Sequence, residues 1–156
     1  PQLLEMVRFG TVLTMPREFD NVKWYGKGPH ENYIDRAVST DLGLYKTTVD
    51  SLFVNYQKPQ EHGERTKVRY AKLSGNGKII FEADREMEFN ACPWSAETLE
   101  NAGHIHELPE SDTLYVRAIA RQMGVGGYDS WGAHTCDEYK NFAGEEYSYG
   151  FSVIIE

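Results

Sequence analysis

The sequence predicts an all-β fold, in which antiparallel strands form a β-sandwich with one short helix. Three observations indicate this class. Several segments alternate apolar and polar residues with a period of two, 13% of the residues are aromatic, and turn-forming Gly and Pro residues separate the alternating segments. The chain has 156 residues, a length typical of one domain, so we expect residues 1–156 to form a single domain.

Six segments show the alternation and are predicted strands: residues 6–15, 21–26, 67–73, 78–91, 113–121 and 146–155. The segment 78–91 is the clearest of them. Its apolar residues share one side, and its polar residues share the other: Ile79, Phe81, Ala83, Met87 and Phe89 against Glu82, Asp84, Glu86, Glu88 and Asn90. The sequence Gly75-Asn76-Gly77 precedes it and predicts a β-hairpin with the strand before.

Only "SAETLENAGH", residues 95–104, is predicted to form a helix. Ser95 is the expected N-cap, Glu97 lies in the first turn, and Gly103 ends the helix. Cys92 and Cys136 are too far apart in the chain for a C-x-x-C motif, so both are expected to be free thiols.

The formal net charge of −8 argues against a nucleic-acid partner, because phosphate binding relies on clustered Lys and Arg. Binding to anionic membranes is disfavoured for the same reason, and no run of about 18 apolar residues predicts a membrane span. The opening "PQLLEMVRFG" has neither an initiator Met nor the pattern of a signal peptide. We therefore expect a piece of a longer protein, and the location, cytoplasmic or periplasmic, stays open.

The glycine-rich segment "MGVGGYDSWG", residues 123–132, places Trp131 beside Asp129. Glycine-rich segments form turns and usually run over the surface. An exposed indole there would stack on the apolar face of a sugar, with Asp129 accepting hydrogen bonds from its hydroxyls. The alternative, in which the indole folds back to cover the core, fits the local sequence equally well.

Two other features have a functional and a structural interpretation. His104 and His106 in "GHIHEL" would point the same way on a strand and could share a metal, but hydrogen-bonded structural histidines are favoured, and no metal site is predicted. The polar clusters at 28–36 and 59–65 could line a pocket, but turns held by their own ion pairs are favoured. No G-x-S-x-G, P-loop, H-E-x-x-H or C-x-x-C pattern occurs, so no catalytic residue is predicted.

Four stretches in order resemble successive motifs of the C-terminal domain, the small-chain region or domain 5, of large β-galactosidases of glycoside hydrolase family 2. They are "WYGKGPHENYIDR" (24–36), "PQEHGERTKVRY" (59–70), "SAETLENAGHIHEL" (95–108) and "MGVGGYDSWG" (123–132). The resemblance implies that residues 1–156 are the later part of a galactose-mutarotase-like supersandwich. If preceding strands are missing, a sheet edge or an apolar face is uncovered, and self-association is expected.

The resemblance also implies a role for Trp131, because the family's tryptophan at this motif reaches the active site of the neighbouring barrel domain and stacks on the sugar. The family often has an acidic residue where this chain has Tyr128, so the hydrogen bonds of the loop are expected to differ. The two catalytic glutamates and the magnesium ligands of the family belong to the barrel domain. None has a counterpart here, so the fragment is expected to hold no cofactor.

The expected function is therefore a non-catalytic part of an enzyme that hydrolyses terminal β-D-galactosides such as lactose. Its expected partners are the galactoside, the catalytic barrel and the other domains of the parent enzyme, and the isolated fragment is expected to be inactive. Two alternatives remain. One is a free-standing carbohydrate-binding module. The other is an aldose mutarotase that uses His104 and His106 as acid and base together with a Glu.

Overall fold

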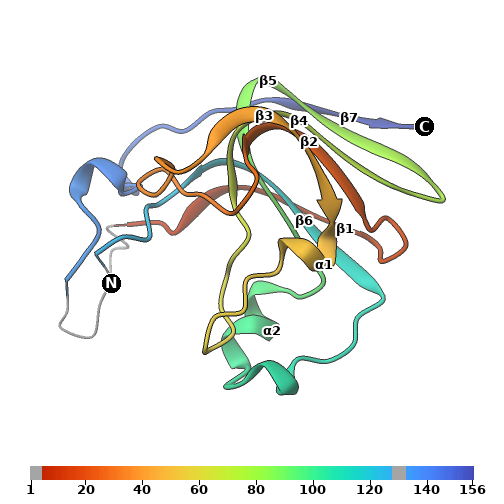
Figure 1. The fold of residues 1–156 in the computed structure, drawn as a ribbon. Coiled ribbons are helices and arrows are strands. Elements are labelled where there is room, and N and C mark those ends of the chain that lie inside the picture. Colours follow the sequence, from red (N-terminus) through yellow and green to blue (C-terminus); the bar gives the residue numbers. More distant parts are fainter. Residues whose placement is uncertain (1–4, 128–132) are drawn as a thin grey trace.

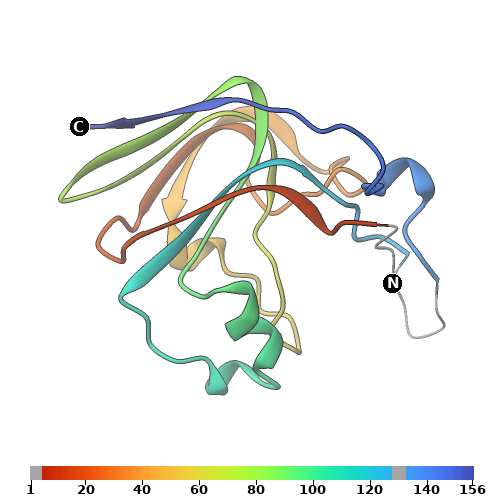
Figure 2. The same ribbon diagram turned by 180° about the vertical axis from the view of Figure 1, so that it is seen from behind.

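The computed structural model describes residues 5–127 and 133–156. In this part of the chain, seven strands form one antiparallel sheet, and the helices are few and short (Figure 1). The predicted all-β, sandwich-like class is confirmed. The same arrangement seen from behind shows that the strands arch over the helical segments (Figure 2).

The elements follow one another along the chain with these bounds: β1 Arg8–Pro16, β2 Asn21–Gly28, β3 Asp41–Thr48, α1 Val49–Leu52, β4 Arg65–Gly75, β5 Gly77–Cys92, α2 Ala96–Asn101, the 3₁₀ helix η1 Ile105–Glu107, β6 Thr113–Gln122, the 3₁₀ helix η2 Asp137–Tyr139, and β7 Phe151–Ile155. All six predicted strands are present, although β7 is shorter than expected. The helix α2 is confirmed, and the Ser95 hydroxyl caps it by accepting a hydrogen bond from the Thr98 N–H at 3.0 Å.

The sequence did not predict β3 or α1. In β3, Leu42 and Leu44 are exposed, whereas Tyr45 packs against the core. The alternation of the two leucines would therefore indicate the solvent-facing side of this strand as its buried side. The helix α1 has only four residues, which is too short for a helical period to show. Its Thr48 side chain accepts a hydrogen bond from the Ser51 N–H at 3.3 Å and so fixes its start. The expectation of a single helix was therefore wrong.

The strand order is β1-β6-β5-β4-β2-β3, and β7 pairs with β5 outside this path. The long strand β5 makes this branching possible. Its first half pairs with β7, from Ile79 opposite Ile155 to Ala83 opposite Phe151, and its second half pairs with β6, from Glu88 opposite Ile119 to Cys92 opposite Tyr115. The predicted hairpin between β4 and β5 is confirmed, because Gly75 and Gly77 are paired across its turn.

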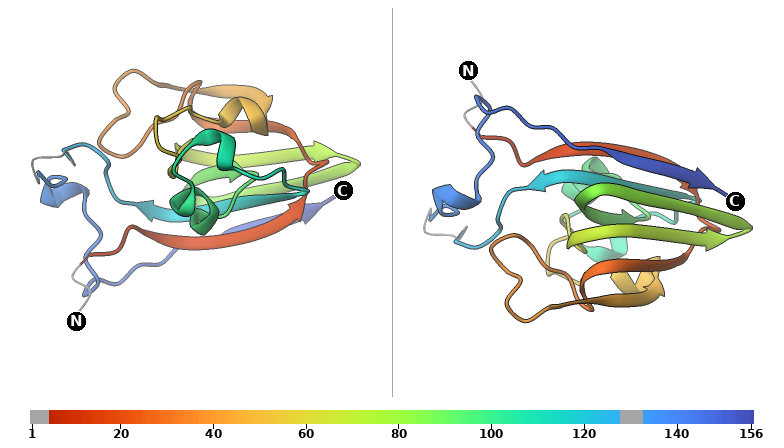
Figure 3. Two further views of the ribbon diagram at one scale, coloured as in Figure 1. Left: turned by 90° about the horizontal axis from the view of Figure 1, so that it is seen from below. Right: turned by 90° about the horizontal axis from the view of Figure 1, so that it is seen from above.

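The hydrophobic core lies on the face of the sheet that α1 covers. Figure 3 shows from below that α1 and α2 lie on the same side of the strands. Trp24, Phe81 and Phe89 are the largest buried side chains of this core, and Val49 and Leu52 contribute from α1. The Trp24 indole N–H donates to the Lys27 carbonyl at 3.0 Å, so its polar atom is satisfied.

Two further expectations concern small features. Cys92 is buried and Cys136 is exposed, and both are free thiols, as the sequence predicted. In the part of the chain that the structure describes, no helix has the length and apolar character needed to cross a membrane.

Candidate functional site

The polar side of β5 is divided between two environments. Glu82, Asp84 and Glu86 are exposed, as the alternation predicts, but Glu88 and Asn90 are buried. The expectation that all five polar residues share one solvent-facing side was therefore wrong for the second half of the strand. The loops that contain the 28–36 and 59–65 motifs cover this half, and the sequence alternation of a strand does not report on such loops.

Asn90 is the central residue of the buried polar layer. Its side-chain N–H donates to the His62 carbonyl, and its side-chain oxygen accepts from the Arg117 guanidinium at 2.8 Å. Arg117 is 2% exposed and comes from β6. The Asn90 amide thus joins the loop before β4 to a buried cation. An apolar side chain at this position would offer neither the donor nor the acceptor that these two bonds need.

Two buried carboxyl groups lie in the same layer. Burial raises the pKa of Glu64 well above its usual range, and the neighbouring Glu88 raises it further. Burial also raises the pKa of Glu88, to about 7, although the Gln122 N–H that donates to this carboxylate opposes the shift. The raised pKa favours the neutral form of the Glu64 carboxyl, which reduces the cost of burying this group.

Asn32 connects the 28–36 motif to β4. Its backbone N–H donates to the Glu64 carbonyl at 2.8 Å. Its side-chain oxygen accepts from the Thr66 N–H at 2.9 Å and from the Thr66 hydroxyl at 2.6 Å. Asn32 is fully buried, so water does not compete for the hydrogen bonds that join the two motifs.

Glu31 makes the second connection between these motifs. One carboxylate oxygen accepts from the Gly63 N–H at 2.8 Å, and the other accepts from the Arg36 guanidinium and the Tyr56 hydroxyl. The Arg36 contact is an internal bond of the kind that the structural interpretation expects, whereas the Gly63 contact joins the two clusters to each other.

Asp35 extends the same network to the glycine-rich segment. Its carboxylate accepts from the Val125 N–H at 3.1 Å and from the Gly126 N–H at 2.6 Å. Gly124 also lies against this carboxylate, because a Cβ on Gly124 would come within 2.6 Å of it. Only glycine allows so close an approach at that position.

Thr135 binds carbonyl groups of the same stretch of the glycine-rich segment. Its hydroxyl lies 2.9 Å from the carbonyl oxygens of both Gly124 and Gly126. Gly127 has a φ of +90°, and a Cβ there would come within 2.8 Å of the His134 carbonyl. Residues 127 and 134 are therefore adjacent, and the two ends of the segment between them are held together.

The predicted sugar-binding residues Trp131 and Asp129 lie outside the described residues, which end at 127 and resume at 133. The structure does describe the residues on either side of them, 124–127 and 133–135, which we call the base of the segment. A pocket of about 190 Å³ lies beside that base and brings together side chains of three loops: Tyr33, Arg36, Tyr56, Gln60, Glu61 and Val125. Aromatic rings are suited to stacking on the apolar face of a sugar, and amide and charged groups are suited to binding its hydroxyls.

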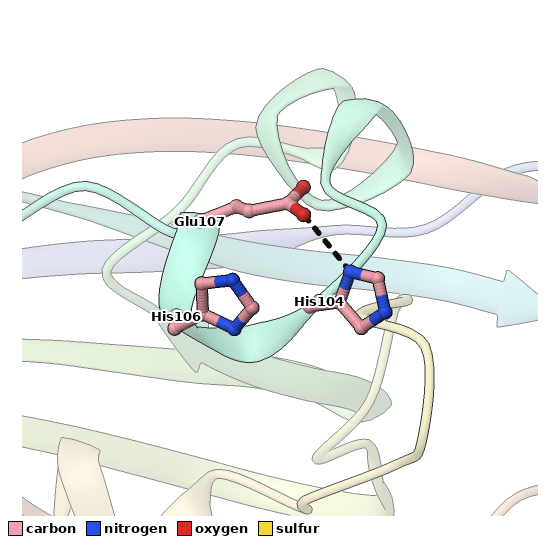
Figure 4. A group of neighbouring side chains, drawn as sticks. All are labelled: His104, His106 and Glu107. Atoms are coloured by element: carbon pink, nitrogen blue, oxygen red, sulfur yellow. Dashed lines mark hydrogen bonds and ion pairs between the residues drawn. The ribbon is translucent and has the colours of Figure 1, made fainter.

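His104 and His106 lie in a different region, on the surface turn that contains η1 (Figure 4). They are not on a strand, as the i, i+2 argument assumed. Their rings are stacked with centroids 5.4 Å apart, and His104 Nδ1 lies 2.9 Å from a Glu107 carboxylate oxygen. This hydrogen bond, together with one from the Gly103 N–H, lowers the pKa of Glu107.

Ligand atoms of His104, His106 and Glu107 lie within 4.8 Å of one another, and among the described residues this is the one group close enough to hold a metal. Magnesium takes oxygen ligands in an octahedron. Two imidazoles and one carboxylate do not match this ligand set, so this group does not fit the magnesium that the resemblance implies for the parent enzyme.

Sequence reasoning found the loops of this site but missed two residues that organise them. Asp35 and Thr135 were not singled out for any role at the glycine-rich segment, although they bind its backbone. Asp35 is 90 residues away from Val125 in the chain. The sequence showed only that Asp35 is an acidic residue within the 28–36 cluster. Its contact with Val125 and Gly126 is formed by the tertiary structure.

Fold and site together define an all-β, sandwich-like structure in which a loop at one part of the sheet binds the start of a glycine-rich segment. The family described as "Beta galactosidase small chain" matches residues 2–153. The chain belongs to this β-galactosidase small-chain family.

The chain is also similar to curated relatives over nearly its whole length. It is 41% identical to a β-galactosidase of Priestia megaterium over 152 residues, which is 96% of this chain and 15% of the relative. It is 36% identical to a β-galactosidase of Halalkalibacterium halodurans, over 97% of this chain and 15% of the relative. It is also 36% identical to one of Streptococcus thermophilus, over 93% and 14%. The chain thus spans about 15% of the length of these relatives.

Proposed function

We propose that this chain forms a non-catalytic wall of the galactoside pocket of a β-galactosidase, to which it contributes Trp131 as a stacking platform and Asp129 as a hydrogen-bond acceptor. The observation that supports this most directly is the double attachment of the glycine-rich segment. Asp35 binds the N–H groups of Val125 and Gly126, and Thr135 binds the carbonyl groups of Gly124 and Gly126. Fixing residues 124–126 favours sugar binding, because a segment whose start is already fixed loses less conformational freedom when it binds.

The catalytic carboxyl groups are assigned to another domain of the parent enzyme. Retaining hydrolysis needs two carboxyl groups about 5–5.5 Å apart on either side of the bond that breaks. In the described residues, the two carboxyl groups with strongly raised pKa values are Glu64 and Glu88, and both are buried. A disaccharide does not reach the Glu64 carboxyl oxygens, because both are buried. The isolated chain is therefore expected to be inactive.

The test of the platform is Trp131→Ala in the full-length enzyme, assayed on lactose and on an aryl β-galactoside. Loss of ring stacking should raise KM and weaken transition-state binding by roughly 1–3 kcal/mol. Trp131→Phe keeps a ring and should recover part of the loss. Trp94→Phe is the control, since Trp94 packs on Phe53 in another part of the chain. Unchanged kinetics in Trp131→Ala would contradict the platform role.

A titration of the 156-residue chain with galactose or lactose separates this proposal from a free-standing carbohydrate-binding module. Our proposal expects no millimolar binding by the isolated chain, because most of the pocket belongs to other domains. Binding that disappears in Trp131→Ala would favour the module. Polarimetry on α-galactose tests the mutarotase alternative, for which acceleration over buffer is required.

We also propose that other parts of the parent enzyme cover the apolar residues exposed on the outer strands. Val12 of β1 and Leu44 of β3 are 54% and 57% exposed, and Ile155 of β7 is 79% exposed. Strands β1 and β3 end the path of the sheet, so their outer backbone groups are open to pairing. The isolated chain is expected to self-associate, as sedimentation would show, and Val12→Lys with Leu44→Lys should reduce the association. A monomeric wild-type chain would contradict the proposal.

A further inference from the structure

We propose that the turn formed by His104, His106 and Glu107 binds one divalent transition-metal ion of the zinc type. This inference does not depend on the proposed galactoside function, and it departs from the expectation that no metal binds this chain. It is based on where the three side chains lie in Figure 4, on the bonds that hold them and on the ligand preferences of zinc.

The three side chains come from four consecutive residues, so a single turn brings them together. The Glu107 N–H donates to the His104 carbonyl at 3.0 Å, and the Leu108 N–H donates to the Ile105 carbonyl at 3.2 Å. These two bonds fix the backbone of η1. The backbone positions of the three residues are therefore set before any ion arrives, which reduces the conformational entropy lost on binding.

The carboxylate of Glu107 is held in its place as well. One of its oxygens accepts from the Gly103 N–H at 2.8 Å, and the other lies 2.9 Å from His104 Nδ1. A separation of 2.9 Å is close to the roughly 3.3 Å between two ligands of a tetrahedral ion with bonds of about 2.0–2.1 Å. A cation can take the place of the proton that this pair shares, and that proton leaves to solvent.

The His106 ring completes the set. Its centroid is 5.4 Å from that of His104, and the two planes differ by 22°. The ligand atoms of the three residues lie within 4.8 Å of one another, so a small rotation of exposed side chains closes the site. All three residues are exposed, and no packed neighbour has to move for this rotation.

The ligand chemistry selects the class of metal. Two imidazole nitrogens and one carboxylate oxygen are ligands of zinc and of its first-row neighbours, whereas magnesium and calcium prefer oxygen alone. Three protein ligands leave a tetrahedral position, which water fills. The site therefore resembles in composition a three-ligand zinc site, with the ion on the surface of the turn.

The test measures metal content rather than activity, so its failure is separate from a failure of the proposed galactoside function. Full-length protein stripped with EDTA is dialysed against ZnCl₂, and bound zinc is counted per chain. His104→Gln, His106→Gln and Glu107→Gln are compared with wild type. His30→Gln is the matched control, because His30 is also exposed and makes one side-chain bond, to Ser39.

Wild type and His30→Gln are expected to bind one zinc ion more per chain than His104→Gln and His106→Gln. Glu107→Gln is expected to bind that ion at least about tenfold more weakly than wild type. Circular dichroism verifies that each variant is folded. X-ray absorption at the zinc edge of wild type gives a second measurement, and it should show imidazole ligands at about 2.0–2.1 Å. Equal zinc content in all the variants, or a wild-type spectrum without imidazole, would overturn the proposal.

Discussion

The two halves of β5 have the same sequence alternation and opposite environments. In the first half, Glu82 and Asp84 face solvent, and the strand pairs with β7. In the second half, Glu88 and Asn90 occupy the equivalent polar positions but are buried, and the strand pairs with β6. The loops of the 28–36 and 59–65 motifs lie over the second half, and Asp35 of the 28–36 loop also binds the glycine-rich segment.

This difference shows that a polar residue in a strand has two possible roles. On the open half of β5 it keeps the surface soluble, and its replacement is expected to matter little. On the covered half it satisfies buried groups of other elements, and its replacement leaves those groups unpaired. The function of the chain is therefore expected to be sensitive to the covered half.

The largest predicted effect is that of Asn90→Ala. The change removes the side-chain donor to the His62 carbonyl and the Asn90 acceptor of the buried Arg117 guanidinium, which keeps a 3.4 Å hydrogen bond to the Trp94 carbonyl. We expect the free energy of unfolding, measured with urea, to fall by roughly 3 kcal/mol. Glu82→Ala, on the open half of the same strand, is the matched control and should change it by less than about 0.5 kcal/mol. Similar losses in the two variants would remove the distinction between the halves.

The second prediction uses pH. The pKa of Glu88 is raised from 4.5 to about 7 in the folded chain, so the folded state binds more protons than the unfolded state between these values. Its contribution to stability is complete below pH 4.5 and is lost as pH rises through about 7.

Glu88→Gln keeps an acceptor for the Gln122 N–H and cannot ionise. Relative to wild type it should gain on the order of 2 kcal/mol between pH 5 and pH 8.5. Glu86→Gln, which removes an exposed carboxylate from the same strand, is the comparison variant. Urea unfolding at both pH values measures the two differences, and an equal pH dependence for both variants would contradict the buried role of Glu88.

The smallest effect concerns the connection from the covered half to the glycine-rich segment. Asp35→Asn places an N–H₂ group against one of the two N–H donors of Val125 and Gly126. On the proposed function, we expect KM for galactosides in the full-length enzyme to rise by an amount equivalent to about 1 kcal/mol, with a smaller change in kcat.

Asp84→Asn on the open half of β5 is the control for Asp35→Asn, and its kinetics should match wild type. If Asp35→Asn lowers the thermal stability and leaves KM unchanged, Asp35 has a structural role only. The double variant Asp35→Asn with Trp131→Ala completes the test. If its KM rises no more than that of Trp131→Ala alone, the two residues act through the same segment.

Much of the fold was predictable because it depends on local patterns. The alternation of Ile79, Phe81 and Phe89 placed the longest strand, the glycines at 75 and 77 placed its hairpin, and Ser95 placed the start of α2. The parts that were missed have weak local signals. The outward Leu42 and Leu44 of β3 contradict the usual pattern, and α1 is a single turn.

The candidate site was predictable only in part, since its motifs are local but their contacts are not. The sequence indicated the loops at 28–36, 59–65 and 123–132. It did not indicate that Asn32 binds Thr66 or that Asp35 binds Val125, because each contact joins residues at least 34 positions apart. The predictions for Trp131 and Asp129 lie outside the described residues and stay predictions.

The sequence by itself determined the fold class, most of the strands, the hairpin of β4 and β5, and the family resemblance, because each depends on neighbouring residues and their spacing. The tertiary structure alone decided which polar residues are buried. Glu88 and Glu82 occupy equivalent positions in the alternation, but Glu88 is buried and Glu82 is exposed. Burial raises the pKa of the Glu88 carboxyl group, and only the folded chain produces that burial.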